Sequence, residues 1–241
     1  MRNGSDRVRP EHHTPAFWHR RAVIGALLAG GGLLAARPLT AWAATAPAGG
    51  QLAFDIRRDG ASIGGHRVRF RRQEGRLEVE IDIDIDISLA FIPLFAYRHR
   101  NREVWQDGRL LSLDSETDDD GRRYTVSARA EAGGLRVSGS GGDFLAPAGT
   151  LPTSYWNPRT VEQSQLLDSQ HGKLLAVQAR LLGEERLEGG EPARRYRLSG
   201  DLDLDLWYSA TGEWLKTAFE ARGAAVSYAR RPGSDALGAS G

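Results

Sequence analysis

An unbroken alternation of aliphatic and polar side chains over residues 77–89 constrains the fold more than any other feature. The aliphatic positions are Leu77, Val79, Ile81, Ile83, Ile85, Ile87 and Leu89, and between them lie Glu78, Glu80, Asp82, Asp84, Asp86 and Ser88. A period of two places these sets on opposite faces of a β-strand, whereas a helix has a period of about 3.6. At about 3.3 Å per residue the strand would extend roughly 40 Å, long against the usual length of about 5–6 residues. The segment therefore predicts a large curved sheet with one dry and one wet face.

The segment before this strand carries arginine at alternate positions and ends in Glu74-Gly75, which suits a two-residue hairpin turn. That turn fixes a register in which arginines face acids and apolar residues face each other: Arg71 with Glu78, Arg69 with Glu80, Arg67 with Asp82, Phe70 with Val79, and Val68 with Ile81. A calcium site needs oxygen ligands gathered around a point, not spread along a strand. The acids therefore predict a solvated ladder of ion pairs, and we expect no metal site.

The next predicted strand, residues 97–106, has no apolar face. Its arginines, Arg98, Arg100 and Arg102, alternate with His99, Asn101 and Glu103. If the arginines face the aspartates of the long strand, the other three side chains point inward, and buried polar groups need partners. The strand therefore either lines a polar pocket or lies at a wet edge of the sheet, and the edge position is favoured.

The chain totals exclude several classes of function. The 241 residues contain 32 basic and 31 acidic side chains, and this near balance gives no field for nucleic acid. The absence of cysteine excludes disulfides, thiolate metal sites, a cysteine nucleophile and a lipid-modified cysteine. We expect no nucleic-acid partner and no cofactor.

The first 43 residues have the features of an export signal. The basic stretch His19-Arg20-Arg21 precedes the apolar run 22–36, and small residues end at Ala43, the preferred cleavage site. The arginine pair and the glycine-rich run resemble a twin-arginine signal. A membrane anchor is disfavoured because a span needs about 20 apolar residues. We expect a periplasmic or extracellular protein with one β domain over residues 44–232, a disordered tail over 233–241, and no membrane span after cleavage.

Residues 139–158 form the only long segment in the mature chain that lacks a regular pattern, because glycine and proline recur throughout it. Tyr155 and Trp156 lie near its end, between Pro152 and Pro158. Long irregular loops are often functional. The loop therefore either plugs one end of the sheet with its aromatic residues or contacts a ligand or partner, and the plug is favoured.

The C-terminal half predicts further hairpins. Residues 160–170 have the length of one or two helical turns, with Thr160 as a candidate cap. From Gly172 onward short strands and turns follow one another, and residues 201–206 repeat the alternation, with three leucines dry and three aspartates wet. Because both halves share this pattern, we expect an all-β fold with one large curved antiparallel sheet, a meander in the form of a half-open barrel with little helix.

Several motifs in this half resemble a known family. They are Thr153–Pro158, Leu166–Gly172 and Arg195–Tyr208, followed by Gly212-Glu213-Trp214 and Phe219-Glu220. The chain resembles the domain of unknown function 6134 family of exported bacterial proteins. That family is distantly similar to periplasmic lipoprotein carriers, in which a half-open barrel shelters acyl chains. The resemblance implies a half-barrel and permits a lipid ligand, although fold alone does not specify function.

The leading functional hypothesis is a non-catalytic binder of a lipid or other apolar ligand on the concave face. The candidate ligand-binding residues are Ile81, Ile83, Ile85, Tyr155, Trp156 and Asn157. The alternative is an envelope scaffold or protein-interaction module whose filled core holds no ligand. An enzyme is disfavoured: Ser154, Asp168 and His171 are residue types that hydrolases use, but no Gly-x-Ser-x-Gly motif surrounds Ser154. We assign no catalytic residue.

Overall fold

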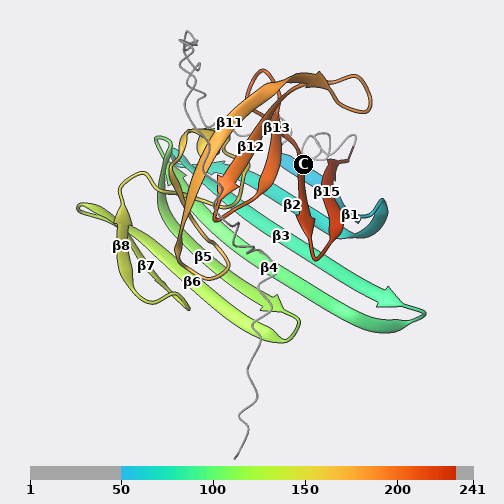
Figure 1. Cartoon of the computed structure of the whole chain (residues 1–241). Coiled ribbons are helices and arrows are strands. Elements are labelled where there is room, and N and C mark those ends of the chain that lie inside the picture. Colours follow the sequence, from blue (N-terminus) through green and yellow to red (C-terminus); the bar gives the residue numbers. More distant parts are fainter. Residues whose placement is uncertain (1–49, 232–241) are drawn as a thin grey trace, which may run out of the picture.

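The alternating residues form one long strand of the computed structural model, which describes residues 50–231 (Figure 1). The strands of the first half are β1 (Gln51–Arg58), β2 (Ala61–Gln73), β3 (Arg76–Leu89), β4 (Ile92–Gln106), β5 (Arg109–Asp119), β6 (Arg122–Glu131), β7 (Gly134–Gly139) and β8 (Phe144–Pro147). Those of the second half are β9 (Leu151–Pro152), β10 (Gln165–Leu167), β11 (Leu174–Arg186), β12 (Pro192–Gly200), β13 (Leu204–Tyr208), β14 (Trp214–Ala221) and β15 (Ala224–Arg230). The predicted signal sequence and the predicted tail lie outside the described residues.

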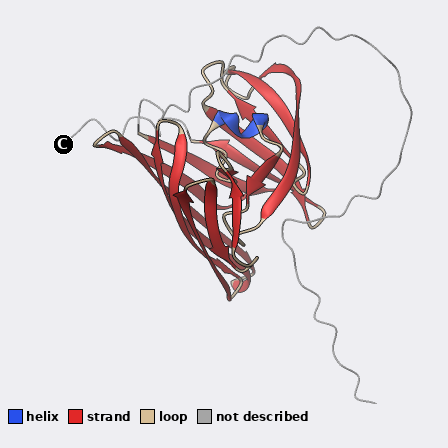
Figure 2. Cartoon of the chain, turned by 90° about the vertical axis from the view of Figure 1, so that its left-hand side faces the viewer, coloured by secondary structure: helices blue, strands red, loops and turns tan. Residues whose placement is uncertain are grey.

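All fifteen described strands belong to one sheet, which confirms the all-β prediction. Its order runs from β8 down to β1, then from β15 down to β9, so each half is a meander and the halves join where β1 pairs with β15. The sheet is antiparallel except between β9 and β10. Figure 2 shows that it curves around the short 3-10 turn Pro158–Glu162 without closing into a barrel. Within residues 50–231, no helix is long and apolar enough to cross a membrane.

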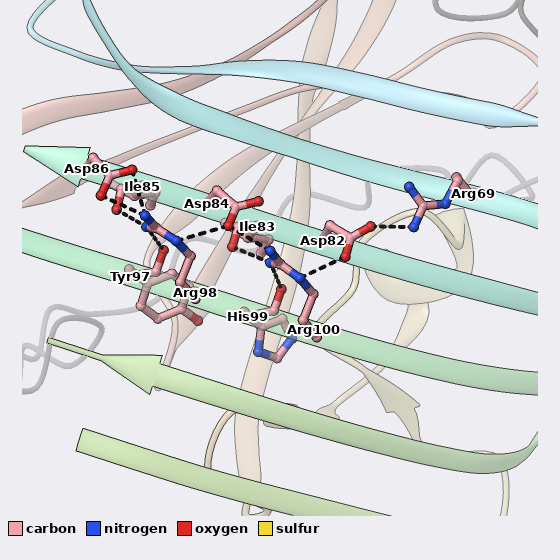
Figure 3. A network of polar contacts seen from close by, with 10 residues as sticks. All are labelled: Arg69, Asp82, Ile83, Asp84, Ile85, Asp86, Tyr97, Arg98, His99 and Arg100. Carbon is pink, nitrogen blue, oxygen red and sulfur yellow. Dashed lines mark hydrogen bonds and ion pairs between the residues drawn. The ribbon is translucent and has the colours of Figure 1, made fainter. Parts of the chain in front are cut away.

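The predicted register of the β2–β3 hairpin is confirmed. Arg67 pairs with Asp82, Arg69 with Glu80 and Arg71 with Glu78 across the two strands. On the outer face, the arginines of β4 continue the ladder, as Figure 3 shows: Arg100 lies 3.0 Å from Asp82 and 2.8 Å from Asp84, and Arg98 lies 3.2 Å from Asp84 and 2.8 Å from Asp86. The aliphatic residues of β3 face the opposite side, into the core.

The favoured edge position of β4 is wrong. This strand lies between β3 and β5 in the N-terminal half of the sheet, and His99, Asn101 and Glu103 are buried on its inner face. The sheet curves back and brings residues 153–170 over this face, where Trp156 donates to Glu103; His99 contacts Thr117, and Asn101 donates to Glu103. The alternative interpretation of the pattern, an inward row of polar side chains, is the one that the structure supports.

Two local predictions for the C-terminal half also need correction. The helical turn covers Pro158–Glu162, its cap is Asn157 and not Thr160, and Gln165–Leu167 form strand β10. Asp205 is buried, not wet, because two arginines of the neighbouring strand β12 cover it, Arg195 at 2.6 Å and Arg197 at 3.2 Å.

Candidate functional site

Trp156 closes one end of the curved sheet. Its ring lies edge-on to Phe70 and Trp105, with centroids 5.3 and 5.2 Å away, and the side chain is 3% exposed. Its indole Nε1 donates to Glu103 Oε2 at 3.0 Å. Trp156 therefore occupies the core as a plug, whereas Thr153, Ser154 and Tyr155 of the same loop line the chamber described below.

Glu103 fastens this plug to strand β4. Besides Trp156, its carboxyl group accepts hydrogen bonds from Trp105 Nε1 at 2.8 Å and Asn101 Nδ2 at 2.9 Å. Complete burial raises the pKa of Glu103, and the hydrogen bonds from Trp156, Trp105, Ser154 and Asn101 oppose that rise. A carboxyl group with this many donors holds its neighbours in one arrangement, because moving any of them would leave a buried polar group unpaired.

A partly open chamber of about 70 Å³ lies next to the plug. Aliphatic and aromatic side chains from β3, β11 and β13–β15 form part of its wall, and polar side chains from β2, β4 and residues 153–170 form the rest. The polar members include His66, His99, Asn101, Thr217, Asp168 and Gln170; the apolar members include Ile81, Ile83, Leu202, Leu204, Phe219 and Tyr228. The chamber is thus an apolar space with a few hydrogen-bonding groups, as small-molecule sites generally are.

Three side chains of the chamber wall have buried polar atoms without a hydrogen-bond partner among residues 50–231. They are both ring nitrogens of His66, the Oδ1 atom of Asn101 and the Nε2 atom of Gln170. The other end of each amide is bonded: Asn101 donates to Glu103, and Gln170 Oε1 accepts from the Tyr97 hydroxyl at 3.2 Å. Buried polar atoms are nearly always paired in folded proteins, so this cluster offers donors and acceptors to a molecule in the chamber.

The two histidines of the chamber are neutral at physiological pH. Burial, reinforced by the nearby His99, lowers the pKa of His66 to about 3. Burial also lowers the pKa of His99 to about 4, and its Nδ1 atom lies 2.8 Å from the Thr117 hydroxyl. The His66 ring is surrounded by aromatic rings, with centroids at 5.1 Å for Trp214 and 5.6 Å for Tyr228. A neutral imidazole offers one donor and one acceptor, so His66 can bind an uncharged polar group.

Asp168 is the carboxylate of the chamber wall. Burial opposes its ionisation, but the hydrogen bond and charge of His171 and the Gln170 backbone N–H outweigh burial and lower its pKa. Its Oδ2 atom lies 2.9 Å from His171 Nδ1, and the His171 ring packs against Tyr124 at 4.7 Å. The Ser154 hydroxyl bonds to Glu103 instead. The structure thus gives Asp168 and His171 a mutual contact without bringing Ser154 into a triad with them.

A second, smaller recess of about 50 Å³ adjoins the chamber. The two spaces share Phe219 and Tyr228 as walls, and Ile63, Ile85 and Ile87 line the recess on its other side. The isoleucines of β3 thus line the two spaces in turn, Ile81 and Ile83 the chamber and Ile85 and Ile87 the recess nearer the β3–β4 turn. No group of three or more histidine, cysteine, aspartate or glutamate side chains within residues 50–231 is arranged to hold a metal ion.

The predicted ligand-binding residues fall into three places. Ile81, Ile83 and Tyr155 line the chamber, and Ile85 lines the smaller recess. Trp156 and Asn157 are buried within the plug, where Trp156 bonds to Glu103 and Asn157 Oδ1 accepts from the Arg159 N–H. The sequence offered His99 and Asn101 as inward polar groups only in the less favoured alternative, and it did not single out His66, although the confirmed hairpin register pairs His66 with Ile83 on the dry face.

These features define a class of curved single-sheet protein of barrel-like form, with a buried plug and a small, partly open chamber. The domain of unknown function family DUF6134 matches residues 54–231, and the chain belongs to this family. The family description assigns no catalytic activity. No curated protein matches the sequence.

A solved structure supports the same class. The crystal structure of a beta-barrel-like protein of the domain of unknown function DUF1849 from Brucella abortus is similar to this chain, with a TM-score of 0.54. The similarity covers 75% of this chain and 94% of that chain at 11% sequence identity. At this identity the likeness concerns the fold alone.

Proposed function

We propose that the protein is a non-catalytic binding protein that encloses a small, largely apolar molecule in the chamber. The unpaired buried atoms of His66, Asn101 and Gln170 carry the proposal. An apolar wall would hold the body of the molecule, and these three side chains would bind one uncharged polar group on it, such as an amide, a hydroxyl or a protonated carboxyl. The predicted export signal favours a periplasmic ligand.

The size of the chamber favours a small molecule over a whole lipid. Typical small-molecule sites have volumes of about 300–1,000 Å³, and the chamber measures about 70 Å³. A lipid chain would fit only if the Trp156 plug or the wall of Phe219 and Tyr228 moved aside. Binding of a whole lipid would therefore require a conformational change.

The competing function is an envelope scaffold or protein-interaction module. The observation that favours it is the filled interior outside the chamber, where Trp105, Trp156 and Trp214 are buried together with Glu103. In that case ordered water alone would occupy the chamber, since one water needs about 10–15 Å³ of such a volume.

Native mass spectrometry of the protein from its own host, followed by solvent extraction, distinguishes the two functions. The ligand hypothesis predicts an added mass that is absent from His66→Phe, because phenylalanine fills the chamber and removes both ring nitrogens. Arg67→Gln is the matched control, since its side chain belongs to the ion-pair face and should leave the added mass in place. An unliganded mass, together with no thermal stabilisation by a library of small amides, alcohols and acids, would contradict the proposal and favour the scaffold.

A further inference from the structure

The turn between β3 and β4 differs from the other two-residue hairpin turns of the sheet. Five of these turns place both residues at positive φ and have glycine second: Asp59-Gly60, Glu74-Gly75, Asp107-Gly108, Asp120-Gly121 and Arg222-Gly223. The β3–β4 turn has the same geometry, with φ of 47° at Ala90 and 70° at Phe91, but contains no glycine. Positive φ is unfavourable for residues with a Cβ atom, and a bulky residue rarely adopts it. Phe91 therefore occupies a position where it weakens its own turn.

Burial does not compensate for this strain, because the tip of the hairpin is exposed. Phe91 is 101% exposed, Ile92 63% and Leu94 56%. Residues 89–95 contain no charged or hydrogen-bonding side chain. Strained residues that neither the fold nor solubility requires are typical of functional positions.

The hairpin also projects beyond its neighbours. The pairing of β2 with β3 ends at Ile85, and the backbone contact of β4 with the β5–β6 hairpin ends at Ala96, so the strand residues from Asp86 to Phe95 pair only with each other. Figure 1 shows the β3–β4 turn extending past the β5–β6 turn. The apolar tip is thus convex and accessible from several sides.

We propose that this tip, residues 90–94, inserts into the interfacial region of a lipid bilayer. A convex apolar tip requires no complementary groove, and a bilayer offers none. Backbone pairing reaches the turn through Leu89 with Ile92, interrupted by one register shift between Ile87 and Ser88 that leaves Leu94 unpaired, and Pro93 has no N–H group, so few unpaired polar groups would enter the hydrocarbon. Phenylalanine, isoleucine and leucine are the side chains that partition there most favourably.

The charges behind the tip favour hydrophobic over electrostatic attachment. Arg98 forms two hydrogen bonds of 2.8 Å with Asp86, which neutralises both groups on the outer face. The Arg222 guanidinium lies over the Phe95 ring, 5.7 Å from its centroid, at the depth where a headgroup phosphate would lie if the tip inserted. Attachment should therefore occur on zwitterionic membranes and depend little on salt. This proposal is independent of the ligand in the chamber.

Co-sedimentation of the protein with phosphatidylcholine vesicles tests the proposal. The expected partition constant is on the order of 10³–10⁴ M⁻¹, similar to or below the value of about 10⁴ M⁻¹ for one myristoyl chain. The double variant Ala90→Asn, Phe91→Gly should bind at least tenfold more weakly. It should also fold at least as well, because Asn-Gly is the preferred sequence for this turn. Any contribution from residues 1–49 is common to both proteins and cancels in the comparison.

The matched control is Leu181→Asn, because Leu181 is an exposed leucine on β11, 46% accessible and in the other half of the sheet. This variant should bind vesicles like the unaltered protein. Equal binding by the tip variant and the unaltered protein, or no binding by either, would overturn the proposal. So would binding that requires anionic lipid and disappears at high salt, or a dimer in light scattering that the tip variant converts to a monomer.

Discussion

Two stretches of the same buried polar row on β4 differ in how completely their hydrogen bonds are formed. At the plug, Glu103 accepts bonds from Trp105, Trp156 and Asn101. At the chamber, two residues closer to the start of the strand, Asn101 Oδ1 lacks a partner within residues 50–231, as do both ring nitrogens of His66 on β2. The Glu103 carboxyl group at the plug is thus fully bonded, although Asn157 Nδ2 in the same loop lacks a partner, whereas the chamber concentrates unpaired atoms on three side chains.

The two regions therefore contribute differently to the free energy of unfolding. A buried polar group that loses its partner costs about 1–3 kcal/mol, so the plug resists opening. The unpaired atoms of the chamber carry a similar cost in the empty protein, and a ligand or water that bonds to them recovers it. The same row of side chains can therefore stabilise the fold at one point and recognise a molecule at another.

Removing the plug should have the largest effect. We expect Trp156→Ala to lower the free energy of unfolding by about 3–5 kcal/mol, because it leaves a cavity between Phe70 and Trp105 and deprives Glu103 of one donor. Urea denaturation monitored by circular dichroism measures this change. Trp156→Phe retains most of the volume and should cost less than half as much. A loss below 1 kcal/mol for the alanine variant would mean that the plug is not packed as described.

The chamber should make the protein sensitive to acid through His66. Its pKa is about 3 in the folded protein against 6.5 for a free histidine, so the unfolded chain binds more protons between these values. The stabilising contribution is therefore present above pH 6.5 and is lost as the pH falls. Because one pKa unit corresponds to about 1.4 kcal/mol, His66 alone should lower the free energy of unfolding by about 3 kcal/mol between pH 7 and pH 4.

His66→Phe isolates this contribution. Glu103 acts in the opposite direction, since its raised pKa favours the folded state at lower pH, and His99 acts in the same direction as His66. Both groups remain in the variant, so the difference between the two pH profiles of unfolding free energy reports His66. At pH 7 the variant should be at least as stable as the unaltered protein, because it replaces unpaired buried nitrogens with carbon. Parallel profiles would show that His66 has water or solvent access that this structure lacks.

The features that could be predicted from the sequence are those that residues close together along the chain determine. The period of two in β3 and the Glu74-Gly75 turn fix which side chains face each other, and the observed register agrees. The contact between Glu103 and Trp156 could not be predicted in this way, because the two residues are 53 positions apart and meet only when the sheet curves. A strand pattern states which face a side chain occupies but not what covers that face. For that reason β4 was wrongly placed at an edge, and the burial of Asp205 was missed.

The outer face of β3 provides the contrasting case, in which polar groups are paired but exposed to water. Asp84 contacts Arg98 at 3.2 Å and Arg100 at 2.8 Å, and both arginines keep a second acidic partner in the ladder. Exposed pairs contribute about 0–1 kcal/mol because water and salt screen them. Asp84→Asn should therefore lower the free energy of unfolding by only about 0.5 kcal/mol, and less in 0.5 M salt.

The matched variant Asp205→Asn removes an aspartate that also contacts two arginines, Arg195 and Arg197, but from a buried position. It should cost more than Asp84→Asn and depend less on salt, because burial reduces screening. Urea denaturation at two salt concentrations compares the two. If both variants cost the same and respond equally to salt, then burial does not determine the value of a polar contact in this sheet, and the contrast between plug and chamber loses its physical basis.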